Sequence, residues 1–349
     1  MPTPDVAATK LTDAGFAEEL GGMLDRVCGM GLFSGAVIVA RGNDVIFERA
    51  CGEADRSSHE PIDMDTKFNV GSMNKMFTAV AAAQLVEQGK LSYDAPLSEF
   101  LDESWLPMRV SGRVTIHQLL THTSGLGDFL NATFEEGSGQ RFRAVGDYRE
   151  LVARDSPRFE PGTDWSYSST GFILLGAVIE SVTGGDYFDY MREYVYGPAG
   201  MGDTDCYDMD SPVENMAVGY SPSADSDTGW EENRHEHFIR GGPAGGGFST
   251  APDLFRFTKA LASGALVSGE SVQRMWTDYQ EGDGSYGYGF MLRQSPKGLV
   301  VGHDGGFTGM EAYYDVYLQT GHTVVVLTNL DGAAWPVDAR IRDLMERLE

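Results

Sequence analysis

The run Phe68-Asn69-Val70-Gly71-Ser72-Met73-Asn74-Lys75-Met76-Phe77-Thr78-Ala79-Val80 carries the strongest structural signal in this chain. It predicts a short extended segment that turns at Gly71 and enters a helix at Ser72, and this helix ends at Gly89, a helix-ending glycine. Ser72 and Lys75 are three residues apart, so a helix places them on one face. A partly desolvated lysine has a lowered pKa and can take the serine proton, so the run predicts a nucleophilic Ser72.

A Ser-x-x-Lys pair is a weak signal when it stands alone, because such pairs also arise by chance. The simplest alternative is an N-cap serine followed by a solvated lysine. Whether Ser72 is a nucleophile therefore depends on what the rest of the chain supplies.

The composition is that of a globular and strongly acidic protein. The 349 residues include 52 acidic and 26 basic side chains, for a net charge of −26, and 42% of the residues are hydrophobic. This charge disfavours nucleic acids and anionic membrane surfaces as partners. Lysine is scarce relative to arginine. We hypothesise that the acidic surface suits a high-salt environment, and stability that does not rise with added salt would count against this.

The sequence contains no obvious targeting or cross-linking signal. No run of eighteen apolar residues is present, so no membrane-spanning helix is expected. Residues 1–5 lack the features of a secretory signal, so we expect a cytoplasmic protein; a periplasmic or secreted one stays open if a signal was removed. Cys28, Cys51 and Cys206 are few, distant and odd in number, so we expect buried small side chains and no disulfide framework.

Three other groups of residues suggest chemistry but have simpler structural interpretations. His117 and His122 lie near serines without a nucleophile elbow, so structural or hydrogen-bonding roles are favoured. His235-Glu236-His237 has no third ligand in view, which favours a solvated loop over a metal site. The glycine-rich run 241–247 does not fit a phosphate loop and favours close backbone approach. We therefore expect neither a metal nor a cofactor.

Hydrophobic patterns place strands near both ends of the chain and helices between them. A helix over 11–30, with Asp13 as a candidate cap, precedes a hairpin of 35–40 and 45–50. Helices are then expected over 114–120, 148–154, 172–179, 187–194 and 251–261, the last capped by Ser249 or Thr250. Four strands over 286–293, 299–303, 310–318 and 322–329 precede a final helix over 336–348.

This order of elements predicts an α+β protein. The simplest packing joins the N-terminal hairpin to the C-terminal strands in one antiparallel sheet, and both terminal helices cover one sheet face. We expect a sheet lobe made of residues 1–62 and 242–349 and a mostly helical lobe of residues 63–241. A functional site is expected in the cleft between the lobes.

Five segments together resemble the β-lactamase-like, penicillin-recognising serine hydrolases. These segments are Ser72-x-x-Lys75, Leu119–Leu126, Tyr167-Ser168-Ser169, Gly246–Leu254 and His303-Asp304-Gly305-Gly306. They occur in the family's order and span nearly the whole chain. The chain is most similar to the branch that holds class C β-lactamases, D-aminopeptidases and carboxylesterases. The resemblance implies the β-lactamase/transpeptidase-like fold, with its active site between the sheet and the helical lobe.

The resemblance also implies a role for each matching residue. Ser72 would be acylated, and Lys75 would take or relay its proton. Tyr167 would act as the partner base, its pKa lowered by the nearby lysine charge, and would pass a proton to the leaving group. The backbone N–H groups of Ser72 and Gly306 would form the oxyanion hole, and the absence of a side chain at Gly305 and Gly306 would let substrate approach.

Two positions depart from the family pattern and favour an ester substrate. Ser169 stands where asparagine usually contacts a substrate amide, and His303 stands where lysine usually holds a substrate carboxylate. Both departures weaken the case for efficient penicillin hydrolysis, whereas an ester needs these contacts less. We expect a carboxylesterase-like hydrolase with small-molecule ester, amide or lactam substrates and with weak β-lactam hydrolysis at most. A class C-type β-lactamase or D-amino-acid peptidase comes next, followed by a catalytically silent binding module. The oligomeric state stays open.

Overall fold

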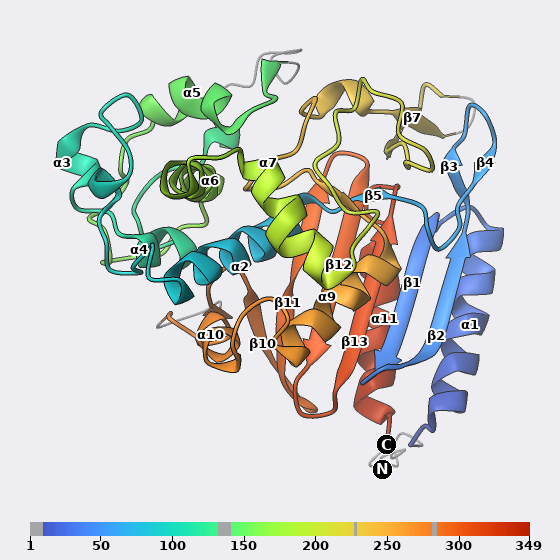
Figure 1. The fold of residues 1–349 in the computed structure, drawn as a ribbon. Helices are drawn as coiled ribbons and strands as arrows, with labels where there is room; N and C mark the ends of the chain where they lie inside the picture. Colours follow the sequence, from blue (N-terminus) through green and yellow to red (C-terminus); the bar gives the residue numbers. More distant parts are fainter. Residues whose placement is uncertain (1–9, 132–140, 227–228, 281–284) are drawn as a thin grey trace, which may run out of the picture.

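The computed structural model describes residues 10–131, 141–226, 229–280 and 285–349. Seven of the described strands form one antiparallel sheet in the order β2-β1-β13-β12-β11-β10-β9. The N-terminal hairpin therefore joins the C-terminal strands, as the sequence predicts (Figure 1). The strands are β1 (Gly35–Arg41), β2 (Asp44–Cys51), β9 (Ser285–Tyr286), β10 (Met291–Ser295), β11 (Gly298–Phe307), β12 (Met310–Tyr317) and β13 (His322–Thr328).

The two terminal helices, α1 (Asp13–Gly29) and α11 (Ala334–Arg347), pack together on one face of this sheet. Phe16, Leu20 and Ile341 are among the side chains that they bury against the sheet residues Val37 and Val326. The opposite face carries α9 (Ala251–Ser263), which contacts β1 and β13 (Figure 1). The predicted packing of both terminal helices on one face is confirmed.

The middle of the chain is mostly helical and lies beside the sheet (Figure 1). Its largest helices are α2 (Asn74–Glu87) and α6 (Ser169–Thr183), which contact each other. The domain boundaries at 62 and 242 stay a prediction. The remaining helices of the described chain are α3 (Met108–Ser111), α4 (Ile116–Leu120), α5 (Arg149–Ala153), α7 (Tyr187–Tyr190), α8 (Gly197–Ala199) and α10 (Gly269–Met275), with a π-helical turn η6 (Met191–Tyr196).

Short elements connect these larger parts. Two-stranded pairs are formed by β3 (Glu53–Asp55) with β4 (Glu60–Pro61), β5 (Phe68–Asn69) with β8 (Phe248–Ser249) and β6 (Tyr220–Pro222) with β7 (Trp230–Glu232). The described 3₁₀ turns are η1 (Gly71–Met73), η2 (Leu97–Glu99), η3 (Phe129–Asn131), η5 (Val145–Tyr148) and η7 (Arg234–Glu236). No helix in the described ranges is both long and apolar enough to cross a membrane.

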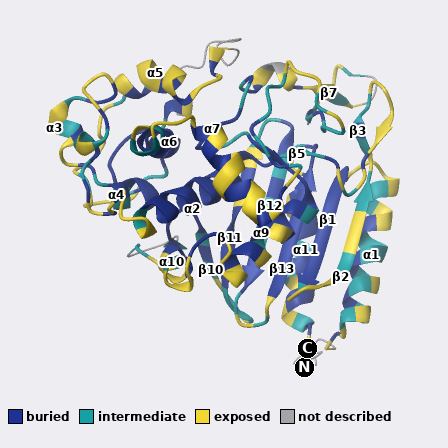
Figure 2. Ribbon diagram, viewed as in Figure 1, coloured by how far each residue is buried: buried dark blue, intermediate teal, exposed yellow. Residues whose placement is uncertain are grey.

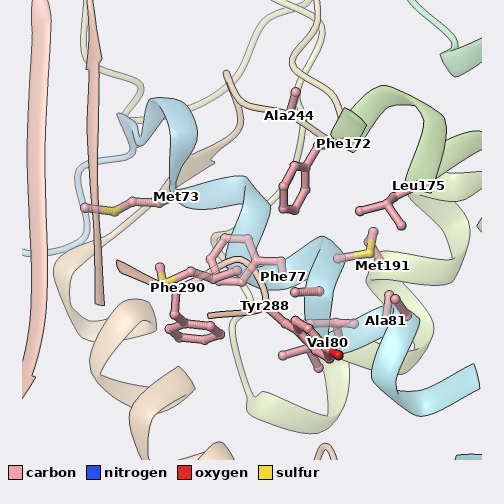
Figure 3. Close-up of a cluster of buried hydrophobic side chains, with 14 of the residues drawn as sticks. Met73, Phe77, Val80, Ala81, Phe172, Leu175, Met191, Ala244, Tyr288 and Phe290 are labelled. Atoms are coloured by element: carbon pink, nitrogen blue, oxygen red, sulfur yellow. The ribbon is translucent and has the colours of Figure 1, made fainter. Parts of the chain in front are cut away.

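Helix α2 is buried around almost its whole circumference (Figure 2). Figure 3 shows Phe77 and Val80 of this helix packed with Phe172 and Leu175 of α6 and with Phe290. A helix that is apolar on all sides belongs in a core, and close packing leaves it little freedom to move. Lys75, at the start of α2, is therefore held by a rigid helix.

The structure refines the predicted boundaries at three places. Ser72 lies in η1, a 3₁₀ turn just before α2, and not inside the α-helix. Helix α1 is capped by Thr12, whose side chain accepts from the N–H of Gly15, and not by Asp13. Strand β11 continues to Phe307, because its pairing with β12 runs on past the apolar residues to Met310.

The structure overturns the expectation that no disulfide is present. Cys28 and Cys51 are bonded, with Cα atoms 6.2 Å apart, whereas Cys206 is a buried free cysteine as expected. The reason is tertiary: α1 packs on the edge strand β2, so the last turn of the helix meets the end of that strand. Neither residue count nor spacing carries that information.

The disulfide is expected to stabilise the fold measurably. It joins residues 23 positions apart, and closing a loop of this length in the unfolded chain is worth about 3 kcal/mol. The double variant Cys28→Ala/Cys51→Ala should therefore unfold at lower denaturant by about that free energy, and reductant should bring the wild type to the same level. Two alkylatable thiols at these positions in the untreated protein would contradict the bond.

Candidate active site

Ser72 is positioned by close backbone contact between η1 and β11. Gly71 has φ +50°, and a Cβ atom there would lie 3.1 Å from the backbone nitrogen of Gly306. A Cβ atom at Gly305 would lie 2.1 Å from the carbonyl oxygen of Val70. Both glycines are therefore required for η1 and β11 to meet. At Gly306, by contrast, a Cβ atom would meet nothing within 4 Å, because this residue faces the pocket described below.

Lys75 is fully buried and its ammonium group faces Ser72. Its Nζ lies 3.1 Å from Oγ of Ser72 and donates to the carbonyl oxygen of Ala244 at 2.5 Å. Burial lowers the pKa of Lys75 to about 7, although Asp128 and Asp304 favour its charged form. The sequence predicted a desolvated lysine beside Ser72, and the structure confirms that environment. At neutral pH a substantial fraction of Lys75 is therefore an uncharged amine that can accept a proton.

Tyr167 lies next to both residues. Its hydroxyl is hydrogen-bonded to the Ser72 side chain, and Nζ of Lys75 lies 4.8 Å from the centre of its ring. The expectation that the lysine charge lowers the pKa of Tyr167 is wrong. Burial raises this pKa well above the usual value, and the hydrogen bond with Ser72 offsets only part of the effect. Tyr167 is therefore a neutral phenol over the whole physiological range of pH.

A largely apolar pocket opens beside Ser72. Ser72, Ser169 and Gly306 line it together with the nonpolar or aromatic side chains of Phe129, Leu130, Tyr148, Ile173, Phe238 and Phe307. Among its described lining residues there is no lysine, arginine, aspartate or glutamate. Apolar walls with a few polar groups at one end are typical of small-molecule sites. The pocket suits an uncharged, mainly hydrocarbon group held next to the Ser72 hydroxyl.

The two positions that depart from the family pattern are both buried. The ring of His303 is shielded from solvent, with Nε2 3.0 Å from the Tyr286 hydroxyl and Nδ1 2.5 Å from the carbonyl oxygen of Asp304. Burial, together with the charge of Lys75, lowers the pKa of His303 to about 3. This arrangement leaves His303 uncharged and without a ring nitrogen for substrate. The backbone N–H of Ser169 donates to Asp128 at 3.2 Å.

His122 holds the segment that carries Tyr167, as the predicted hydrogen-bonding role anticipates. Its carbonyl oxygen accepts from the N–H of Ser166 at 3.0 Å, and its Nδ1 accepts from the N–H of Ser168 at 3.1 Å. The ring also packs 4.4 Å from the ring of Tyr167. His122 thus fixes both neighbours of Tyr167 as well as its ring. His117 bonds to the Tyr288 hydroxyl instead.

Replacing His122 should disturb Tyr167 without touching substrate. His122 has φ +61°, a conformation that asparagine tolerates better than leucine. His122→Leu loses the acceptor for a buried N–H, so we expect a loss of about 1–3 kcal/mol in unfolding free energy and at least about a tenfold fall in kcat. His122→Asn should retain more of both. Thermal unfolding and steady-state kinetics test this, and equal behaviour of the two variants would contradict it.

Three contributors to the site were not predicted from the sequence to be site residues. Asp128 and the carbonyl oxygen of Ala244 both surround the Lys75 ammonium, and His237 lines the pocket. His237 is buried, with Nε2 2.8 Å from the carbonyl oxygen of Thr308, so the expectation of a solvated loop is wrong for this residue. Asp128 closely follows the matching segment Leu119–Leu126, which was a usable signal.

The glycine-rich run acts as predicted, by letting backbones approach. A Cβ atom at Gly245 would lie 3.1 Å from the carbonyl oxygen of Gly71, and one at Gly241 would lie 2.2 Å from the backbone of Gly246. The run leads into α9, which is capped by Thr250. No group of three or more potential metal ligands was found within the described ranges.

Most of the chain matches a known family. A family model described as Beta-lactamase matches residues 27–348, which include Ser72, Lys75, Tyr167 and the glycines of β11. The chain belongs to this family. Its members are serine hydrolases, and the family includes esterases and peptidases. The resemblance inferred from the motifs is confirmed, and so is the predicted β-lactamase/transpeptidase-like fold.

Individual relatives in the Beta-lactamase family carry different names. Penicillin-binding protein 4* of Bacillus subtilis is 31% identical over 312 residues, which cover 85% of this chain and 68% of that protein. Esterase EstB of Burkholderia gladioli is 36% identical over 233 residues, covering 62% of this chain and only 57% of the esterase. The crystal structure of a penicillin binding protein from Bacillus halodurans superposes with a TM-score of 0.85 at 32% identity, covering 93% of this chain and 98% of that one.

Proposed function

We propose that this serine hydrolase is a carboxylesterase-like acyl hydrolase that works through an acyl-enzyme on Ser72 and has weak β-lactam hydrolysis at most. The observation that carries this proposal is the state of His303. A penicillin carries a carboxylate that a cation at this position would hold, but His303 is buried, uncharged and hydrogen-bonded within the protein. A simple ester has no carboxylate to place there. The apolar walls of the pocket beside Ser72 also favour a hydrocarbon acyl group.

In the proposed acylation step, Oγ of Ser72 bonds to the acyl carbon while the neutral amine of Lys75 takes its proton. The developing oxyanion is bound by the backbone N–H groups of Ser72 and Gly306. As the carbon–oxygen bond to the alcohol breaks, the Tyr167 hydroxyl donates a proton to the leaving oxygen, and the Lys75 ammonium returns a proton to Tyr167. Water then attacks the acyl carbon, and the same groups carry its proton back to Ser72.

This assignment makes Tyr167 an acid for the leaving group, since its raised pKa keeps it protonated. Tyr167→Phe should lower kcat/KM for an ethyl ester by about a hundredfold. In a p-nitrophenyl ester with the same acyl group, the leaving p-nitrophenolate needs no protonation, so kcat/KM for this ester should fall much less. Because kcat/KM reports acylation, comparing the two esters isolates the proton transfer. Equal losses for both esters, or near wild-type values, would remove this role from Tyr167.

The proposed substrate class is tested by turnover of a short-chain p-nitrophenyl ester and of a chromogenic cephalosporin, measured side by side. We expect Ser72-dependent ester turnover with little cephalosporin turnover. Strong cephalosporin hydrolysis would favour the second candidate, a class C-type β-lactamase, to which the similarity to named penicillin-binding proteins points. Turnover of neither substrate, without covalent labelling, would favour a silent binding module.

A further inference from the structure

A second cavity is lined by Tyr167, whose hydroxyl is hydrogen-bonded to the Ser72 side chain. It encloses about 400 Å³, and its described lining includes Trp165, Tyr167, Asp304, Tyr313, Trp335 and Arg342. That volume lies within the range of small-molecule sites. None of the residues that line this cavity also lines the pocket beside Ser72. The proposed proton donor therefore lines a separate cavity, which we call the tryptophan groove.

The tryptophan groove is lined by aromatic rings that are open to solvent. Trp335 is 51% exposed and Trp165 is 38% exposed, so both rings are partly open to solvent. The ring of Trp335 lies 6.2 Å from that of Tyr313, and the guanidinium of Arg342 lies 5.6 Å from the Trp335 ring centre. Exposed aromatic side chains in a concave site commonly serve to stack against a ligand.

Backbone hydrogen bonds to β12 hold the start of α11, which carries Trp335, in place. The N–H groups of Ala334 and Trp335 both lie within hydrogen-bond distance of Oε2 of Glu311 on β12, at 2.8 and 3.1 Å. The first turn of α11 is thereby tied to the sheet strand that neighbours β11. Trp335 is far from Tyr167 in the sequence, but the sheet brings both to one cavity.

Both arginines of the groove already face a carboxylate, and Asp304 adds a further carboxylate to the lining. Arg293 binds Asp315 at 2.6 Å, and Arg342 lies 2.7 Å from Asp338. Ion-paired guanidinium groups offer little to an anionic ligand, which would have to displace their carboxylate partners. An uncharged aromatic group fits the described lining better, because it stacks on the rings without disturbing these pairs.

We propose that the tryptophan groove binds the alcohol part of the substrate and selects an aromatic one. This proposal rests on the proposed function and deepens it by naming the leaving group. When Ser72 bonds to the acyl carbon and the ester carbon–oxygen bond breaks, the proton from Tyr167 converts the leaving oxygen to a neutral alcohol. Tyr167 both lines this groove and bonds to the Ser72 side chain, so an alcohol that it protonates can extend from Ser72 into the groove. Trp165 and Trp335 are then specificity-determining residues.

Benzyl acetate and cyclohexylmethyl acetate test this selection, since both release a primary alcohol of similar size and they differ mainly in aromaticity. We expect the wild type to prefer the benzyl ester by about five- to tenfold in kcat/KM. This ratio corresponds to the free energy of one or two aromatic contacts. Trp335→Leu should bring this ratio close to one, and Trp335→Phe should preserve most of it. Tyr194→Leu, which removes an exposed aromatic outside the groove, should leave the ratio and the basal activity unchanged.

The outcomes separate this inference from the proposed function. Ser72-dependent turnover of both esters with a wild-type ratio near one would overturn the aromatic groove and leave the esterase proposal standing. A ratio that Trp335→Leu does not change would likewise overturn it. A wild type that prefers an alcohol bearing a carboxylate would show that Arg293 or Arg342 recognises an anion. Failure of the wild type to hydrolyse any ester would instead refute the proposed function.

Discussion

Ser72→Ala is expected to lower ester turnover by about 10⁴-fold or more while leaving the fold intact. In the proposed mechanism this hydroxyl bonds to the acyl group, and it contacts both Lys75 Nζ and the Tyr167 hydroxyl. The substitution removes one small, partly buried atom, so the melting temperature should change little. Steady-state kinetics and thermal unfolding of the purified variant check both parts.

The matched control for this variant is Ser181→Ala. Ser181 lies near the end of α6, where its hydroxyl donates to the carbonyl oxygen of Phe100. It is a serine of the same lobe that takes no part in the site, so its variant should retain wild-type turnover. Ser72→Ala with more than about 1% of wild-type turnover would contradict nucleophilic catalysis by Ser72.

Lys75→Met is expected to have the second largest effect on activity. The neutral amine is the proposed proton acceptor, so its removal should lower kcat/KM by about 10³-fold or more at pH 8. Wild-type kcat/KM should fall as the pH drops through about 7, because Lys75 becomes protonated there. Lys259→Met, on α9, is the matched control and should retain both the rate and the pH profile.

The same variant should separate catalysis from stability. Burial holds the pKa of Lys75 near 7 in the folded state against an ordinary 10.5, so the unfolded state binds more protons between these values. The free energy of unfolding of the wild type therefore rises as the pH rises from 7 toward 10.5. Below pH 7 the wild type carries the whole destabilisation that comes from burying the charged Lys75. Lys75→Met removes the buried charge and should be more stable than the wild type, most clearly at pH 7 and below. A rate that does not depend on pH near 7, or a less stable methionine variant, would contradict the lowered pKa.

The sequence predicts the architecture well where local patterns decide it. Apolar runs and alternating apolar residues indicate the hairpin and the C-terminal strands, and the apolar run 172–179 indicates the middle of α6. The residue at which β11 ends could not be predicted in the same way. Its last residues, from His303 to Gly306, lack a hydrophobic pattern, and they remain in the strand because β12 continues to pair with them.

The sequence pointed to candidate site residues that the structure brings together, but their electrostatics could not be predicted from it. Ser72, Lys75 and Tyr167 stand in recognisable motifs, whereas the raised pKa of Tyr167 depends on how completely the fold buries its ring. The same is true of His303, whose ring bonds to Tyr286 on another strand. The disulfide also depends on a tertiary contact, that of α1 with β2.

Covalent labelling tests directly whether Ser72 is the nucleophile. The protein is incubated with a serine-reactive fluorophosphonate, and the modified residue is identified by peptide mapping and mass spectrometry. We expect one adduct per chain, on Ser72. This adduct should be absent in Ser72→Ala and should form more slowly in Lys75→Met. An unlabelled wild type, or an adduct on another serine such as Ser168 or Ser169, would contradict it.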